Sequence, residues 1–369
     1  MPPDISGLRA PASLRKVLRS GLLPALFLFF SIHCAALGRP VEIQEESHRE
    51  ELDAAEVTVR EVFLMGTVAT IQVRGAEPSS RRKLAADLIT SLERTEDELS
   101  TWRRSSELSR LNQAQIGAQF ALSDSTCEML KSVFDLSQRT GGAFDPAIGR
   151  LIEVWDLQGQ GRIPGETELK PLLDRGGLKG FDFRRASCEV VRRVDTTIDA
   201  GAFGKGEALD RLDGIGSRFE NSSWQVNLGG QVRVSVAPGH APWIVELASP
   251  EDRESTVAEI VLSKGSIATS GSLLRDRWVE GRRIGHLLDP RTGIPAKYFG
   301  SVAVWHRSAL QADALSTALF VMGPKDGLEW AEREAVAACY LFMEDGVLKV
   351  LSSSEFQKMF VKGRGFGER

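Results

Sequence analysis

Residues 57–73, VTVREVFLMGTVATIQV, are followed at 79–100 by SSRRKLAADLITSLERTEDELS, and this succession decides the fold class. The first segment alternates and is rich in β-branched residues, which is typical of a strand pair or of one long strand with a bulge at Gly66. The second segment repeats large residues at three- and four-residue steps, which predicts a helix with one apolar stripe. The stripe comprises Leu84, Leu88, Leu92, Glu96 and Leu99.

The rest of the chain does not alternate strands and helices regularly. A second helix is predicted from a serine cap near Ser123 to a stop at Gly141. After Val191 we predict mostly short strands joined by glycine-containing turns. Helices are expected near 204–213, 309–322 and 326–334. Because regular βαβ units are absent, we expect an α+β fold with mixed, largely antiparallel sheets flanked by helices.

The N-terminus predicts export. Four basic residues within 9–19 precede the charge-free stretch SGLLPALFLFFSIHCAALG (20–38). A basic region, an apolar region and a small-residue end are typical of a secretory signal, so 1–38 is assigned as an export signal with cleavage after Gly38. The alternative of a membrane anchor is disfavoured because the apolar core, 22–32, is shorter than the roughly 20 residues needed to span a bilayer.

Two further features concern the N-terminal region. Cys34 raises the possibility of a lipoprotein, although Ser31 and His33 do not fit the usual lipidation pattern. Residues 39–56, RPVEIQEESHREELDAAE, are charged without apolar periodicity, which predicts a tether. The expected location is periplasmic or at the outer face of the inner membrane. Any membrane contact would come only from a retained N-terminal segment.

Charge and cysteine content exclude two classes of function. Loss of residues 1–38 removes four basic side chains and Asp4, which changes the formal net charge from −4 to −7. This sign opposes binding of a phosphate backbone, so nucleic acid is not an expected partner. Cys127, Cys188 and Cys339 have wide, unpatterned spacing, which suggests neither a disulfide framework nor a cysteine zinc site.

The stretch IDAGAFGKGEALD (198–210) resembles a phosphate-binding loop without matching a known one. Gly204 and Lys205 are followed by glycine where a P-loop requires serine or threonine, and the glycine spacing does not fit the dinucleotide fingerprint. We predict a strand over 196–200, a small-residue turn and a helix, with free backbone N–H groups and Lys205 facing an anion. The alternative is that small residues only allow close packing, with Lys205 solvated.

Two other sites carry candidate chemistry. Asp313 and Thr317 are four residues apart, so on a helix they offer a carboxylate and a hydroxyl on one face, which suits magnesium. The alternative is an acidic first-turn residue that complements the helix dipole. The stretch GHLLDPRTGIP (285–295) is predicted to form a short strand and a turn. Its second residue, His286, is either a candidate base or a structural residue.

Taken together and in order, these stretches resemble the ApbE family, the FAD:protein FMN transferases, from about residue 60 to about 355. The matching stretches are MGT (65–67), STWRRSSELSRLN (100–112), TGGAFDPAIG (140–149), IDAGAFGKGEALD (198–210), VNLGG (226–230), IATSG (267–271), HLLDPRTG (286–293) and ADALSTALFVMG (312–323).

The resemblance implies a fold and an activity. It implies a T-fold-like single globular body with two lobes, placed at 57–360. The implied reaction transfers FMN from FAD to a threonine, or occasionally serine, hydroxyl of a partner protein, requires Mg²⁺ and releases AMP. The acceptor would be a membrane-linked redox protein with a D-x-x-[ST]-G-[AS]-T-like sequence, which this chain lacks. The alternatives are a non-catalytic FAD-binding protein and a Mg²⁺-dependent FAD pyrophosphatase.

The resemblance also assigns roles to residues. Magnesium would be bound by the Ala202 carbonyl, Asp313 and Thr317. The catalytic candidates are His286 and Asp313, and the base is either His286 or a carboxylate near the metal. The residues expected to contact FAD are Met65, Trp102, Ala143, Phe144, Asp145, Asp199, Lys205, His286 and Leu287.

The chain departs from the family pattern at four residues. Gln231 stands where aspartate is common, Ser272-Leu273 replaces a polar-aromatic pair, and Glu207 replaces a frequent aromatic residue. These departures bear on turnover and on acceptor choice more than on FAD binding.

Overall fold

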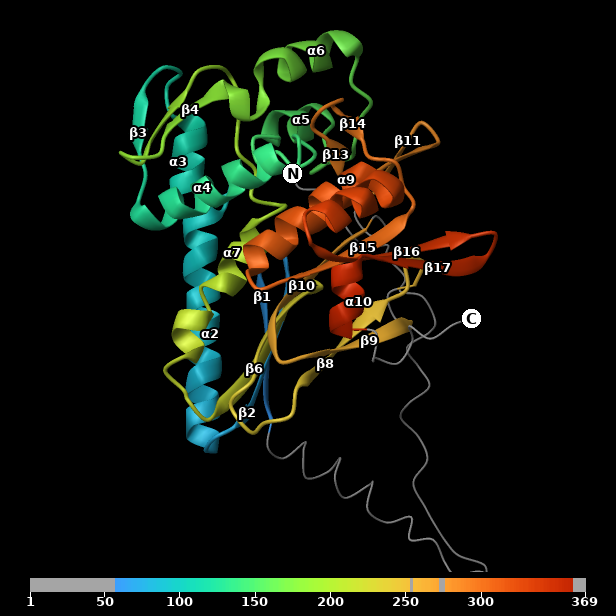
Figure 1. Cartoon of the computed structure of the whole chain (residues 1–369). Helices are drawn as coiled ribbons and strands as arrows, with labels where there is room; N and C mark the ends of the chain where they lie inside the picture. The colour runs from blue at the N-terminus through green and yellow to red at the C-terminus, as the bar shows by residue number, and fades with distance from the viewer. Residues whose placement is uncertain (1–56, 253–254, 272–275, 361–369) are drawn as a thin grey trace, which may run out of the picture. The chain divides into compact units, whose positions relative to one another are not determined.

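An eight-stranded sheet forms the centre of the protein (Figure 1). The computed structural model describes residues 57–252, 255–271 and 276–360. All neighbouring strands of this sheet are antiparallel, which confirms the predicted fold class. In spatial order the strands are β1 (Thr58–Leu64), β2 (Thr67–Gly75), β6 (Ser222–Leu228), β7 (Gln231–Ser235), β10 (Lys264–Gly271), β15 (Gly300–His306), β16 (Ala337–Glu344) and β17 (Val347–Ser352).

Smaller sheets and helices surround the large sheet. The small sheets are β3 (Gln119–Ala121) with β5 (Glu189–Arg192) and β4 (Phe181–Arg184), then β8 (Trp243–Ala248) with β9 (Thr256–Leu262), β11 (Arg277–Val279) with β12 (Arg282–Ile284), and β13 (Leu288–Asp289) with β14 (Ile294–Pro295). The helices are α2 (Pro78–Leu99), α3 (Glu107–Gln113), α4 (Asp124–Arg139), α5 (Gly149–Val154), α6 (Glu166–Arg175), α7 (Gly204–Asp210), α8 (Asp213–Gly216), α9 (Ala309–Arg333), α10 (Ser354–Phe360) and the short 3₁₀ helix η1 (Gly177–Gly180).

Several N-terminal predictions lie outside the described residues. These are the export signal at 1–38, with Cys34, and the tether at 39–56. Ser272 and Leu273 also lie outside them. Across the described ranges, no helix combines the length and the apolar character needed to cross a membrane.

The opening segment forms a strand pair, so the bulged-strand alternative is wrong. β1 and β2 are joined by Met65 and Gly66, with φ angles of 51° and 72°. Left-handed backbone at both positions is typical of a type I′ hairpin turn, and only the second of the two residues is glycine. Helix α2 covers one face of the hairpin, because its leucine stripe and the inward residues of β2 share a buried cluster. Thr95, and not Glu96, completes the buried stripe.

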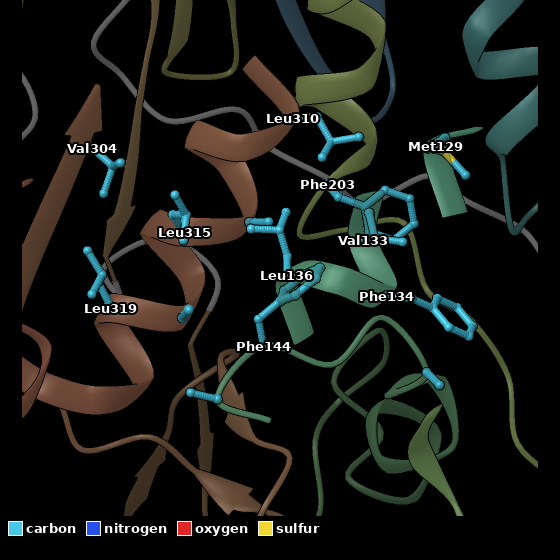
Figure 2. Close-up of a cluster of buried hydrophobic side chains, with 14 of the residues drawn as sticks. Met129, Val133, Phe134, Leu136, Phe144, Phe203, Val304, Leu310, Leu315 and Leu319 are labelled. Atoms are coloured by element: carbon cyan, nitrogen blue, oxygen red, sulfur yellow. The ribbon is translucent and has the colours of Figure 1, made fainter. Parts of the chain in front are cut away.

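The second core lies between α4, α9 and the loops that precede α5 and α7. Figure 2 shows Val133 and Leu136 of α4 pointing toward Phe144 and Phe203 of these loops, with Leu315 of α9 beside them. The rings of Phe144 and Phe203 meet edge to face with centroids 6.5 Å apart. This packing fixes the two loops that flank the predicted site. Helix α4 confirms the helix predicted from Ser123, whose side chain accepts a hydrogen bond from the Thr126 N–H.

The C-terminal helices predicted at 309–322 and 326–334 form one element, α9, with a break. Gly323 has a φ of 80° and precedes Pro324, and both features interrupt the regular helix. At its N-terminus Ser308 caps the helix by accepting from the Gln311 N–H. The strand predicted over 196–200 is wrong, because this segment pairs with no strand.

A disulfide joins Cys127 of α4 to Cys188 beside β5, a pairing that the spacing of the cysteines did not suggest. The β4–β5 hairpin packs on α4, where the rings of Phe134 and Phe183 meet with centroids 5.1 Å apart. This tertiary contact brings the two sulfur atoms together. The two cysteines are 61 residues apart in the sequence, and this spacing does not predict that they pair. Cys339 is a buried free thiol.

We expect loss of this disulfide to destabilise the protein strongly. Replacement of both Cys127 and Cys188 by alanine should lower the free energy of unfolding by about 4 kcal/mol, because the closed loop no longer restricts the unfolded chain. Denaturant unfolding of the oxidised protein and of the double variant measures this difference. A reductant should shift the midpoint of the oxidised protein and leave that of the double variant unchanged; equal midpoints before reduction would contradict the prediction.

Candidate functional site

Lys205 and Asp313 meet where α7 begins against α9. The Lys205 Nζ lies 3.1 and 3.2 Å from the two carboxylate oxygens of Asp313. The Gly206 N–H donates to the same carboxylate at 3.1 Å. The Asp313 side chain is 7% exposed and that of Lys205 is 19% exposed. The structure therefore brings together two residues that are 108 positions apart in the sequence and that were both predicted site residues.

Four of the backbone amides at the turn before α7 are paired within the protein. The N–H groups of Phe203 and Gly204 donate to the Ala200 carbonyl. The Gly201 N–H donates to the Asp199 carboxylate, and that of Gly206 to Asp313. These four amides are therefore not free to bind an anion, whereas the Lys205 side chain places a positive charge beside them. The turn closes on itself because its own carbonyl and carboxylate oxygens lie within reach.

The oxygen atoms expected to bind magnesium belong to adjacent elements. Asp313 and the half-buried Thr317 lie one turn apart on α9, and Ala202 lies in the turn just before α7. Across the described ranges, no three His, Cys, Asp or Glu side chains gather at one point. One carboxylate, one hydroxyl and one carbonyl are hard donors that suit Mg²⁺ when phosphate and water complete its shell. These residues therefore fit the ion, and the Asp313 carboxylate would bind the ion as well as Lys205.

Met65 lies beside this cluster and is fixed through its main chain. Its N–H donates to the Glu96 carboxylate at 3.0 Å. A Cβ atom on Gly204 would lie 3.6 Å from the Met65 Cε, so the methionine reaches the turn before α7. Arg103 donates to the other Glu96 oxygen at 3.4 Å. The neighbouring Trp102 is 73% exposed, which leaves its ring free to contact a ligand.

The loop before α5 can contact a ligand mainly through its backbone atoms. The side chains of Ala143 and Phe144 are buried in the core, so only their main-chain atoms can contact a ligand. The Asp145 carboxylate accepts from the N–H groups of Ala147 and Leu178 at 2.8 and 3.1 Å. Burial raises the pKa of Asp145 despite these two bonds. Asp145 thus holds this loop against η1.

Asp199 is the remaining acidic residue predicted to contact FAD. Burial raises the pKa of its carboxyl above the ordinary value, and the bond from the Gly201 N–H lowers it only in part. The Asp199 N–H donates to the Pro146 carbonyl, which joins this segment to the loop before α5. The two loops named by the sequence therefore meet at Asp199.

His286 and Leu287 lie between β12 and β13. Leu287 packs against the core formed by α4 and α9. The ring Nδ1 of His286 lies 3.2 Å from an oxygen of Asp276, whose side chain is 4% exposed. No hydrogen bond joins His286 to Lys205 or Asp313 in the described part of the chain.

Two cavities adjoin the predicted residues. One of about 230 Å³ is lined by Gly142, Asp145, Pro290 and Arg291, and so joins the loop before α5 to the turn after His286. A larger one of about 840 Å³ lies between α2, α4, α7 and the start of α9, with Glu207 in its lining. Neither Lys205 nor Asp313 lines either cavity. We place the site at the Lys205–Asp313 pair because it joins a positive charge to a buried carboxylate.

Two of the departures from the family pattern have structural partners. The Gln231 Nε2 donates to the Ala309 carbonyl at 2.8 Å, which holds the first turn of α9 against β7. Glu207 accepts from the Arg211 Nε at 2.8 Å. In the described part of the chain, neither residue forms a hydrogen bond or ion pair with Asp313.

Sequence reasoning missed two residues that act on the predicted site. Glu96 was placed in the apolar stripe of α2, and a carboxylate among leucines was itself a signal that this position faces something other than the core. Asp276 lies in the stretch RDRWVEGRR (275–283), which carries no pattern. Only the folded β11–β12 hairpin brings Asp276 to His286.

Comparison with known proteins identifies relatives over most of the chain. The model of a family described as "ApbE family" matches residues 65–341. The FAD:protein FMN transferase of Escherichia coli (strain K12) is 29% identical over 317 residues, which cover 84% of this chain and 90% of the relative. That of Salmonella typhimurium is 29% identical over 311 residues, with 81% and 88% covered.

Solved structures resemble the whole described body. The ApbE protein from Thermotoga maritima matches with a TM-score of 0.75 and 30% identity, over 83% of this chain and 99% of that one. The Pseudomonas stutzeri flavinyl transferase ApbE, in its apo form, matches with a TM-score of 0.73 and 26% identity, over 85% and 98%. The flavin transferase ApbE from Vibrio cholerae gives a TM-score of 0.71 and 28% identity, over 83% and 99%.

Proposed function

The chain belongs to the ApbE family, and we propose from this membership that it transfers the FMN half of FAD to a hydroxyl group of a partner protein. Its curated relatives are named FAD:protein FMN transferases. The observation that carries the proposal is the buried pair of Lys205 and Asp313 beside Thr317. These groups supply a positive charge for a pyrophosphate and oxygen donors for a cation at one place.

The proposed roles follow from the charges and positions of these side chains. Lys205 binds and neutralises the diphosphate of FAD. Asp313, Thr317 and the Ala202 carbonyl hold Mg²⁺, which when bound stabilises the negative charge on the departing AMP phosphate. Asp313 also orients Lys205 through the bonds to its Nζ. Phosphoryl transfer needs positioning and charge neutralisation more than covalent help from the protein. Lys205 and the metal-binding oxygens are groups of the kind that this reaction needs.

His286 is proposed as the base that accepts the proton of the acceptor hydroxyl. In this transfer the hydroxyl oxygen bonds to the FMN phosphorus, the P–O bond to the AMP phosphate breaks, and the proton goes to the imidazole. Met65 and Trp102 are proposed to contact the isoalloxazine ring, because an exposed indole and a thioether both pack well on a flat aromatic surface. The acceptor is proposed to carry a threonine or serine in a D-x-x-[ST]-G-[AS]-T-like segment of a membrane-linked redox protein.

The protein is proposed to work outside the cytoplasm, in the periplasm or at the outer face of the inner membrane. The disulfide between Cys127 and Cys188 supports this, since such bonds persist mainly in oxidising compartments. An N-terminal mass of the exported protein tests whether residues 1–38 are removed, retained or lipidated. Recovery of the protein only from the cytosolic fraction, with its full N-terminus, would overturn the proposed location.

One assay tests the proposed activity. The purified protein is mixed with FAD, Mg²⁺ and an acceptor domain, and the mass of the acceptor and the release of AMP are followed. Covalent FMN with an equal amount of AMP is expected. Bound FAD without AMP would instead identify a binding protein, and AMP with free FMN a pyrophosphatase.

A further inference from the structure

The carboxylate of Asp276 lies between two basic side chains. Its Oδ2 accepts from the Arg283 Nε at 2.7 Å. Its Oδ1 lies 3.2 Å from both the main-chain N and the ring Nδ1 of His286. Burial works to raise the pKa of Asp276, but the hydrogen bonds from His286 and Arg283 outweigh it and the pKa is lowered. Asp276 is therefore a carboxylate, not a carboxylic acid, at neutral pH.

The local fold explains how Asp276 reaches His286. Asp276 directly precedes β11, and Arg283 lies in β12, three residues before His286. In the hairpin Arg277 pairs with Ile284, so the residue before the first strand lies beside the residues after the second. The Arg283 guanidinium also stacks on Tyr298, with its carbon 4.1 Å from the ring centroid. The hairpin and this stacking hold Asp276 in place.

The geometry determines which ring nitrogen of His286 carries a hydrogen. An ionised carboxylate only accepts hydrogen bonds, so the Nδ1 that faces Asp276 must be the protonated nitrogen. In the neutral ring the Nε2 is then the atom with a free lone pair. The second bond, from the main-chain N–H of His286 to the same oxygen, restricts the orientation of the ring.

We propose that Asp276 is a positioning residue of the flavin transferase: it fixes the His286 tautomer so that Nε2 accepts the proton of the acceptor hydroxyl. This inference rests on the proposed function. As the hydroxyl oxygen bonds to the FMN phosphorus and the P–O bond to AMP breaks, the proton moves to the Nε2 of His286. The imidazolium that forms faces an anionic carboxylate, which stabilises its charge. Asp276 itself stays ionised throughout.

The first test is Asp276→Asn, with Glu280→Gln as the matched control. Glu280 lies at the exposed tip of the same hairpin and undergoes the same change from carboxylate to amide. The amide of Asn can donate as well as accept, so it no longer imposes one tautomer. We expect kcat for FMN transfer to fall by about 100-fold. The KM for FAD should change little, and Glu280→Gln should behave like the wild type.

A double-mutant cycle separates positioning from a structural effect. In a His286→Ala background, Asp276→Asn should cause no further loss, because the group it positions is absent. A further 100-fold loss in that background would overturn the inference. Equal kcat values for Asp276→Asn and the wild type would also overturn it.

A spectroscopic measurement tests the tautomer without any turnover. Nitrogen-15 NMR of the His286 ring, assigned with His286→Ala and recorded on the alkaline plateau of a pH series, should show an unprotonated Nε2 in the wild type. In Asp276→Asn it should show a mixture or the other tautomer. A protonated Nε2 in the wild type would refute the inference. Failure of the wild type to modify any acceptor would instead refute the proposed function and leave this readout intact.

Discussion

Replacement of Asp313 by asparagine is expected to lower the Mg²⁺-dependent rate of FMN transfer by about a thousandfold. The side chain supplies the only anionic ligand assigned to the metal, and loss of metal stabilisation of the leaving phosphate corresponds to several kcal/mol in the transition state. Asparagine keeps the shape of the side chain, so the change tests charge more than packing. Single-turnover transfer at a series of Mg²⁺ concentrations measures the effect.

Binding of FAD distinguishes this prediction from general damage to the site. Lys205 keeps its charge in Asp313→Asn and loses its carboxylate partner, so FAD binding in the presence of EDTA should persist. Asp326→Asn is the matched control, because it makes the same change at an exposed position further along α9. It should leave transfer unchanged. An Asp313→Asn protein with normal Mg²⁺ dependence would rule out the assigned metal site.

Local patterns predicted the elements that hold the site. The leucine spacing of α2, the serine cap of α4 and the helical stretch of α9 each depend on residues close in sequence, and all three are present. Helix propensity and capping act over one or two turns, so a single chain carries enough information for them.

Contacts between distant segments were not predictable in the same way. The pairing of Cys127 with Cys188 depends on how the β4–β5 hairpin packs on α4, and spacing alone does not encode it. The segment at 196–200 has the composition of a strand, but it lies where no neighbouring strand is available. Propensity for β structure describes a fit to a sheet, so tertiary context decided against it.

The glycine-rich turn combines a charged side chain with close packing at neighbouring residues. Lys205 lies at a largely buried position, where it pairs with Asp313, and four amides of the turn are paired within the protein. Close packing is present one residue further on. A Cβ atom at Gly206 would lie 2.4 Å from the Ala309 carbonyl oxygen and 2.5 Å from the Leu310 Cα. Composition alone could not assign these two roles to neighbouring residues.

Gly206→Ala is therefore expected to destabilise the protein by roughly 3 kcal/mol or more, because the obstructing atoms belong to the backbone and cannot rotate away. The added methyl group would push α7 away from the first turn of α9. There the Asp210 carboxylate accepts from the Leu310 N–H at 3.0 Å, and Gln231 donates to the Ala309 carbonyl. Urea unfolding followed by circular dichroism measures the loss.

Gly214→Ala is the control, because Gly214 is also helical and a Cβ there would meet nothing within 4 Å. Alanine favours a helix over glycine by about 1 kcal/mol, so this variant should be as stable as the wild type or more so. If Gly206→Ala folds, the displaced α7 moves Lys205 relative to Asp313. The rate of FMN transfer should then fall even at urea concentrations at which the variant is still folded. Wild-type stability together with wild-type transfer in Gly206→Ala would show that contact between α7 and α9 does not set the geometry of the site.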